Sequence, residues 1–185
     1  MTKTSVRSSG VRDMTYISLF AVIIGVCSWL SIPASVPFTM QTFAVFAAVG
    51  VLGGRRGTLA VLVYLLLGAV GLPVFSGFAG GPGVLLGATG GYILGFLLSA
   101  LAMWAMEAVL GRKTWVLAIS MVLGLLICYA FGTLWFMTVY ARNSGPIGLM
   151  AALSLCVFPF ILPDLLKIAL ALALSKRLSK ALNLD

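Results

Sequence analysis

Two ionisable residues inside the last apolar stretch carry the clearest chemical signal in this sequence. Asp164 and Lys167 stand in the segment Phe-Pro-Phe-Ile-Leu-Pro-Asp-Leu-Leu-Lys that begins at Phe158. An ionisable side chain costs at least about 2.5–3.5 kcal/mol at the centre of a membrane helix, so it normally faces the bundle interior and marks a ligand or ion path. A separation of three residues places both side chains on one helix face. The pair therefore predicts a polar binding site within the membrane.

Two simpler interpretations of this pair stay open. Asp164 and Lys167 could form an ion pair that only neutralises itself, or Lys167 could extend to the membrane interface. Pro159 and Pro163 argue against both, because they free backbone carbonyls just before Asp164. Hydrocarbon tolerates such irregular backbone only where it is buried in protein or lines a wet cavity.

The uncharged segment from Pro73 to Gly83, and the glycines that follow it, form a second candidate. Glycine lets a backbone or a ligand approach very closely, although glycines in membrane helices also serve helix packing. A neutral loop of this kind on the outer side is a plausible lid over a pocket. Thr89 and Tyr92 could supply hydroxyl groups beneath it.

Gln41 and Thr42 form a third candidate, because they are polar groups at the outer start of a hydrophobic span. Helix capping and hydrogen bonding between helices explain them as well as ligand contact does.

Other chemistry finds little support. The chain has no histidine and only four carboxylates, of which Asp13 and Asp185 lie in the tails. Glu107 is expected to be a solvated charge at the cytoplasmic end of a span. No phosphate-binding loop, metal-ligand cluster or Ser/His/Asp set is present. We therefore expect a binding protein rather than an enzyme, with no cofactor and no metal. The three cysteines match no disulfide or metal spacing and are expected to be packing residues: Cys27, Cys128 and Cys156.

The elements that position these groups must be membrane helices. The chain has 185 residues, 62% apolar and 9% charged, whereas a soluble domain carries roughly 25% charged residues. Barrel strands would alternate apolar and polar positions, but this sequence has unbroken apolar runs such as Leu59–Leu72. We predict an all-α integral membrane protein with one transmembrane domain over residues 1–185, short tails at 1–13 and 176–185, and six spans. The expected spans are Thr15–Ser31, Thr39–Gly53, Thr58–Leu72, Val84–Leu110, Trp115–Tyr140 and Gly148–Leu174.

The second and third spans are shorter than the roughly 20 residues of a straight crossing. Their ends must therefore extend into the flanking segments, or these helices must be broken. The expected breaks between spans are Ile32–Pro37, the charged turn 53–57, the loop 73–83, the turn 111–113 and the connection 142–146.

Basic residues indicate the orientation. Arg55, Arg56, Arg112 and Lys113 lie in alternate connections on the side of both tails, and the opposite side holds only Arg142. Positive loops stay cytoplasmic, so both termini are expected in the cytoplasm and the protein in the plasma membrane. The formal charge of +8 is then explained by topology, and no nucleic-acid partner is needed. The basic start before the first span is a tail, not a cleaved signal peptide.

The three candidate stretches together resemble the BioY family, the biotin-specific substrate-binding subunits of energy-coupling-factor (ECF) vitamin transporters. The matching segments are Val36–Gln41, Gly71–Gly77, Gly80–Phe96 with its Gly-Ala-Thr-Gly-Gly-Tyr core, and Pro163–Lys167. The resemblance implies six helices with a biotin pocket near the outer face. It also implies a membrane coupling subunit and two ABC-type ATPases as partners. The sequence departs from the family at Ala88, where proline is usual, and at Ala79, where some members have a polar residue.

On this resemblance, Asp164 accepts from the ureido N–H groups of biotin, and Lys167 meets the ureido carbonyl or the carboxylate. The two roles could be exchanged along the ligand. The expected ligand-binding residues are Asp164, Lys167, Tyr92, Thr89, Gln41, Phe75, Phe78, Ala79, Gly80 and Gly81. The docking face of the first helix is expected at Ser18 and Val22, with Ala21 and Gly25 nearby.

Two other functions stay open. One is a related subunit for thiamin or riboflavin, although a cationic ligand would favour more aromatic and acidic groups than one balanced pair. The other is a membrane enzyme, which the lack of histidine and of a second intramembrane carboxylate disfavours.

Overall fold

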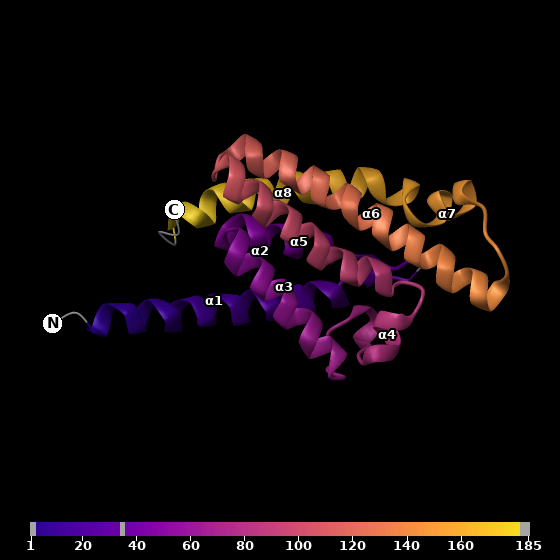
Figure 1. Cartoon of the computed structure of the whole chain (residues 1–185), viewed down its shortest axis with the longest axis horizontal. Helices are drawn as coiled ribbons and strands as arrows, with labels where there is room; N and C mark the ends of the chain where they lie inside the picture. Colours follow the sequence, from indigo (N-terminus) through magenta and orange to yellow (C-terminus); the bar gives the residue numbers. More distant parts are fainter. Residues whose placement is uncertain (1–2, 34–35, 182–185) are drawn as a thin grey trace.

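The computed structural model describes residues 3–33 and 36–181, and over these residues it is almost entirely helical (Figure 1). Eight α-helices, one short 3₁₀ helix and a two-stranded antiparallel hairpin are present in this part of the chain. The elements are α1 Lys3–Trp29, β1 Ser31–Ile32, β2 Phe38–Thr39, α2 Gln41–Leu52, α3 Gly54–Ala69, η1 Ser76–Phe78, α4 Pro82–Leu86, α5 Gly90–Leu110, α6 Thr114–Ser144, α7 Leu149–Cys156 and α8 Phe158–Ala181.

Four helices of the described chain are long and apolar enough to cross a membrane. These segments are Gly10–Trp29, Gly90–Leu110, Thr114–Ser144 and Phe158–Ser179. They fall within or across four of the six expected spans. The other two spans correspond to α2, of 12 residues, and α3, of 16 residues. The fold class is therefore confirmed as all-α and membrane-embedded, and the count of six crossings stays a prediction.

Helix α2, which is shorter than α3, lies at the centre of the bundle. It packs against α1, α3, α5 and α8, and every one of its residues except Phe43 is buried. At a rise of 1.5 Å per residue its 12 residues extend about 18 Å. Because protein surrounds it, this helix does not need the length of a helix that faces lipid.

The chain enters α2 through a hairpin rather than through further helix. Ser31 pairs with Thr39, and Ile32 with Phe38, while the amide of Met40 donates to the carbonyl of Leu30. The expected break at 32–37 is thus confirmed for its described residues, and Ala34 and Ser35 lie outside them. The prediction that Thr39 starts the second span is wrong by two residues, because Thr39 belongs to the paired strand.

The turn between α2 and α3 is tighter than predicted. Only Gly53, with φ +84°, interrupts the helices, and α3 begins at Gly54, so Arg55 and Arg56 belong to its first turn. The Glu107 carboxylate of α5 accepts the Gly54 amide at 2.7 Å. Glu107 is half-buried and caps α3, which corrects the expectation of a merely solvated charge.

Two of the predicted long spans are broken. The expected span from Val84 to Leu110 divides into α4 and α5, separated by Gly87–Thr89, and the last span divides into α7 and α8 at Val157. Val157 has non-helical backbone angles, φ −127° and ψ −57°. Pro163 lies inside α8, as the sequence placed it within a helix.

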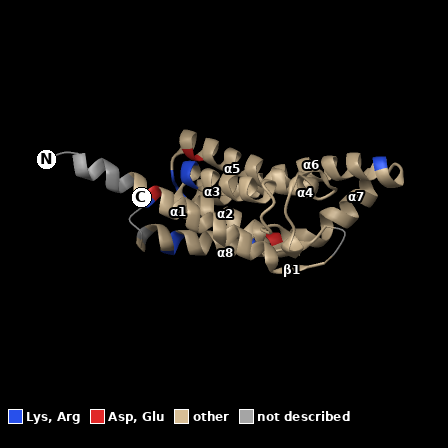
Figure 2. Ribbon diagram, turned by 90° about the horizontal axis from the view of Figure 1, so that it is seen from below, with Lys and Arg blue, Asp and Glu red and all other residues tan. Residues whose placement is uncertain are grey.

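The helical ends also run further than expected. Helix α1 begins at Lys3 and α8 continues to Ala181, so most of both predicted tails is helical. Residues 182–185 lie outside the described part. The N-terminal end of α1 and the C-terminal end of α8 lie at the same end of the bundle (Figure 1). Basic residues gather at that end, and blue also appears at the opposite end, near α6 and α7 (Figure 2).

Candidate ligand-binding site

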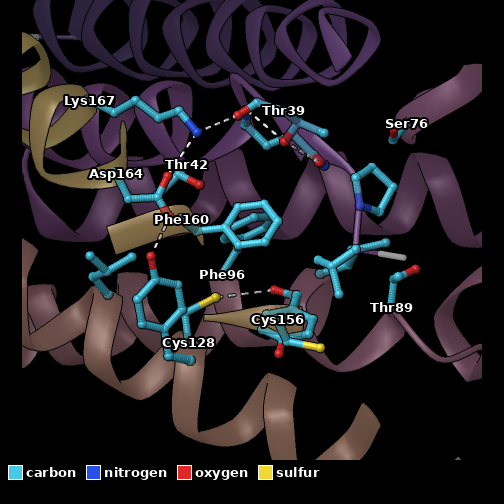
Figure 3. Close-up of a pocket in the computed structure, with 17 residues that line it drawn as sticks. Thr39, Thr42, Ser76, Thr89, Phe96, Cys128, Cys156, Phe160, Asp164 and Lys167 are labelled. Atoms are coloured by element: carbon cyan, nitrogen blue, oxygen red, sulfur yellow. Dashed lines mark hydrogen bonds and ion pairs between the residues drawn. The ribbon is translucent and has the colours of Figure 1, made fainter. Parts of the chain in front are cut away.

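One cavity opens where the hairpin and the start of α2 meet α5, α6 and α8 (Figure 3). Its volume of about 70 Å³ is below the roughly 300–1,000 Å³ of typical ligand pockets. A ligand larger than a few water molecules therefore requires some lining side chains to move outwards. The lining residues are Val36, Pro37, Thr39, Gln41, Thr42, Ser76, Thr89, Tyr92, Ile93, Phe96, Leu125, Cys128, Tyr129, Cys156, Phe160, Asp164 and Lys167.

The ion pair between Asp164 and Lys167 forms one wall of this cavity. The Lys167 ammonium lies 2.8 Å from Oδ1 of Asp164, and the two residues are only 4% and 3% exposed. Removing two charges from water is costly unless further hydrogen bonds satisfy their remaining atoms. The surroundings of each charge therefore decide whether the pair is stable.

Asp164 has a second donor on a neighbouring helix. The hydroxyl of Tyr129, on α6, donates to Oδ2 of Asp164 at 2.7 Å. Hydrogen bonds to charged groups contribute about 1.5–3 kcal/mol. Tyr129 therefore holds the carboxylate in place and joins α6 to α8.

Lys167 has two further partners, both in the hairpin strand β2. Its ammonium donates to the backbone carbonyl of Thr39 at 2.7 Å. The same nitrogen lies 4.0 Å from the ring centroid of Phe38, a distance at which a cation is attracted to the face of an aromatic ring. The lysine therefore fixes the hairpin to α8. It also donates a hydrogen bond to a carbonyl that lies before the first residue of the short helix α2.

Gln41 lines the cavity with its amide already engaged. Its Nε2 donates to the hydroxyl of Tyr64, on α3, at 2.5 Å, and its Oε1 accepts from the hydroxyl of Thr39 at 2.9 Å. The neighbouring Thr42 also lines the cavity. The structure thus shows the bond between helices that the sequence left undecided, and it also places Gln41 in the lining of the cavity.

Tyr92 and Thr89 come from the start of α5 and line the cavity, and Thr89 lies across the cavity from Lys167 (Figure 3). The Tyr92 ring packs directly over Gly132 of α6, where a Cβ atom would overlap ring carbons. Its hydroxyl is 2.9 Å from the hydroxyl of Thr133. Close packing and this hydrogen bond fix the ring in one position.

The expected glycine-rich lid contributes only one residue, Ser76, to the cavity. Phe75 is fully buried and packs edge-on against Tyr64 at 5.6 Å, away from the cavity lining. Phe78 is 64% exposed and stacks on Trp29 at 5.0 Å. The structure therefore does not bring either aromatic ring to the cavity.

The small residues of the same loop are also outside the lining. The loop closes on itself, because the Phe75 amide donates to the carbonyl of Ala79 at 2.9 Å, and it is tied to α3, because the Gly81 amide donates to the carbonyl of Gly68 at 2.7 Å. A Cβ atom at Gly80 would overlap backbone of Leu72. This contact explains the glycine at position 80 by packing against the segment that follows α3.

Sequence reasoning missed several lining residues, above all Tyr129. A signal for it was present: Tyr129 and Thr133 are polar groups four residues apart in an apolar span, and that spacing places them on one helix face. The aromatic residues Phe96 and Phe160 gave no such signal, since they look like any other apolar residue in a span. Cys128 and Cys156, expected only to pack, also line the cavity and are free thiols.

The predicted docking face on α1 is divided between two sides of that helix. Ser18 is exposed and Val22 is 58% exposed. Ala21 is 2% exposed, and a Cβ atom at Gly25 would meet the Val74 side chain at 3.5 Å. Ala21 and Gly25 therefore face the bundle, which corrects their inclusion in an outward surface.

These features define an integral membrane protein that holds a polar, buried small-molecule site within an apolar helical bundle. The model of the BioY family matches residues 1–184. The chain belongs to the BioY family.

Named relatives agree with this assignment. The chain is 42% identical over 171 residues to the biotin transporter BioY of Thermotoga maritima, covering 92% of this chain and 97% of that protein. It is 38% identical over 168 residues to the probable biotin transporter BioY of Pyrococcus horikoshii, covering 90% of this chain and 96% of that protein. A crystal structure of the S-component for biotin from an ECF-type ABC transporter superposes with a TM-score of 0.83 at 28% identity, covering 97% of this chain and 95% of that one.

The buried pair yields a prediction about stability. Breaking a buried pair typically costs about 3–5 kcal/mol, because the other charge is left unpaired. Asp164→Asn or Lys167→Met alone should therefore lower the thermal midpoint of the purified protein strongly, whereas the double variant should recover much of the loss. The matched control is Asp13→Asn, which removes the half-exposed pair between Asp13 and Arg56 at 3.0 Å and should cost at most about 1 kcal/mol. Equal effects at Asp13 and Asp164 would contradict this account.

Proposed function

We propose that this protein is the biotin-binding subunit of an ECF-type ABC transporter and captures biotin from outside the cell. The observation that carries the proposal is the Asp164–Lys167 pair, which lines the cavity while almost fully buried. Family membership and the biotin-named relatives support the identity of the ligand. In this role the protein binds and does not catalyse, and it needs no resident cofactor.

The two charges suit the polar groups of biotin. Its ureido ring offers two N–H donors and one carbonyl, and its tail ends in a carboxylate. The Asp164 carboxylate is an acceptor for the N–H groups, and the Lys167 ammonium is a donor for an oxygen at either end. Tyr92, Phe96 and Phe160 supply apolar surface for the fused rings.

Six membrane crossings, with both termini in the cytoplasm, complete the proposal. Helices α2 and α3 are joined at the basic end of the bundle by a turn at Gly53, which lies near Arg55, Arg56 and Arg112, so α2 runs towards that end and α3 runs back from it as two successive crossings. Basic connections favour the cytoplasmic side. The cavity then lies about 18 Å from that side, at the far end of α2, and so in the outer half of the membrane.

The partners in this proposal are a membrane coupling subunit and two ABC-type ATPases. The outward residues of α1 offer a surface for the coupling subunit, since Ser18 is small and exposed and Val22 follows one turn later. Small residues let two membrane helices approach closely.

The ligand can be tested on the purified protein by thermal shift. Biotin at about 100 times its dissociation constant should add about 2.7 kcal/mol of stability, and thiamin or riboflavin should add none. The folded Asp164→Asn/Lys167→Met variant should bind biotin roughly a hundredfold to ten-thousandfold more weakly, because two hydrogen bonds to charged groups are lost. Stabilisation by another vitamin and not by biotin would overturn the assignment. Unchanged affinity in the double variant would move both residues from the site to the scaffold.

The orientation can be tested with an impermeant thiol reagent on whole cells. In a background with Cys27, Cys128 and Cys156 replaced by alanine, Asn143→Cys should react from outside. Arg55→Cys should react only after the membrane is permeabilised. The reverse order of reactivity would contradict cytoplasmic termini.

The docking surface can be tested by adding bulk to α1. Ser18→Trp should prevent close approach of a partner helix and so reduce co-purification of the coupling subunit, while biotin still stabilises the variant. Leu126→Trp is the control, since Leu126 is 55% exposed on α6. Assembly that is normal in Ser18→Trp, or impaired equally in Leu126→Trp, would place the docking surface elsewhere.

A further inference from the structure

A second concave site lies at the basic end of the bundle, between the start of α6 and the last turns of α8. This groove has a volume of about 330 Å³. Lys113, Thr114, Lys176 and Ser179 line it, and none of the described residues in its lining is acidic. It is separate from the ligand cavity, with which it shares no lining residue.

The basic side chains that line the groove come from two parts of the chain. Lys113, from the α5–α6 connection, and Lys176, from α8, are both exposed. The guanidinium of Arg112 adds a third charge while it donates to the carbonyls of Gly50 and Val51 at 3.2 and 2.7 Å. Arg112 is thereby anchored to the end of α2, and the two lysines remain the side chains best able to reach a bound anion.

The first turn of α6 adds backbone donors beside these lysines. The first hydrogen bond of this 31-residue helix joins the Leu117 amide to the Lys113 carbonyl at 2.9 Å. The amides of Thr114, Trp115 and Val116 therefore have no carbonyl partner within the helix. Such amides and the helix dipole favour a negatively charged group at this point.

Exposed apolar side chains at the same end of the bundle place the groove at the level of the lipid headgroups. Trp115 is 53% exposed and directly follows Thr114, and Ile119, one turn further along α6, is 47% exposed. Trp104, near the same end of α5, is 38% exposed. Tryptophan is enriched where a membrane protein meets the interface, and the exposed isoleucine continues into the hydrocarbon region.

We propose that this groove binds the phosphate headgroup of an anionic phospholipid, with Lys113 and Lys176 holding the phosphate and the acyl chains continuing past Leu117 of the groove lining into the hydrocarbon region. An inorganic phosphate ion shares the headgroup chemistry, but it has no acyl chains to place in that region. The groove therefore selects a lipid of the leaflet at the basic end, independently of the vitamin site.

Binding can be measured on the delipidated full-length protein by native mass spectrometry and by thermal shift. The probes are phosphatidylglycerol, phosphatidylcholine of the same acyl chains, and inorganic phosphate. The test variant is Lys113→Gln/Lys176→Gln. The control is Arg55→Gln/Arg142→Gln, which removes the same charge from positions outside the groove. Biotin-dependent stabilisation reports whether each variant is folded.

Phosphatidylglycerol should bind more tightly than phosphatidylcholine, and the lysine variant should bind it about 30-fold more weakly, while the arginine variant binds it normally. Three results would overturn the proposal. They are equal binding of the two lipids, equal losses in the two variants, and occupation by inorganic phosphate with no preference for phosphatidylglycerol.

Discussion

The ammonium group of Lys167 is almost completely removed from water, and three neighbouring groups compensate for that. One is the carboxylate of Asp164, one is the backbone carbonyl of Thr39, and one is the ring of Phe38. Since these groups belong to α8 and to the hairpin, the positions of both elements depend on the same nitrogen atom. Tyr129 extends the network to α6 through the second oxygen of Asp164. The ion pair thus determines how three parts of the bundle meet, and it does so at the wall of the cavity.

The short central helix follows from this arrangement. A chain segment that is not helical can exist at membrane depth only if its polar backbone groups find partners within the protein. The hairpin satisfies part of this requirement by pairing Ser31 with Thr39, and Lys167 satisfies the carbonyl that faces the cavity. Helix α2 can therefore begin well inside the bundle, and the space above its first residue, Gln41, becomes available for a site. The same length would be inadequate for a helix exposed to lipid.

The sequence predicted those features whose energetic cost can be recognised from residue type and position along the chain. Charged residues in an apolar run are conspicuous, so Asp164 was found and lies where it was expected. The glycine-rich loop was misassigned, since glycine permits close approach without revealing what approaches, and here Phe75 packs against α3 while the loop closes on itself. Tyr129 was missed because the distance to Asp164 along the chain hides a contact made by tertiary packing. The break at Val157 was missed although Pro159 indicates it, because proline lacks an amide donor and disfavours helical backbone in the residue before it. The sequence interpretation used Pro159 only to explain free carbonyls near Asp164.

The hydrogen bonds of the cavity wall have a thermodynamic consequence for discrimination between molecules. Within the described part of the chain, every buried side-chain nitrogen or oxygen already has a partner, so entry of a guest is an exchange reaction in which internal bonds are broken and must be replaced. A molecule whose donors and acceptors match the broken bonds recovers their free energy, whereas one of similar size and different polarity leaves charged groups unsatisfied. The protein therefore rejects an unsuitable molecule because the broken internal hydrogen bonds are not replaced, and the free-energy penalty increases with each unmatched group. The correct ligand is distinguished less by the new contacts it makes than by leaving no buried polar group without a partner.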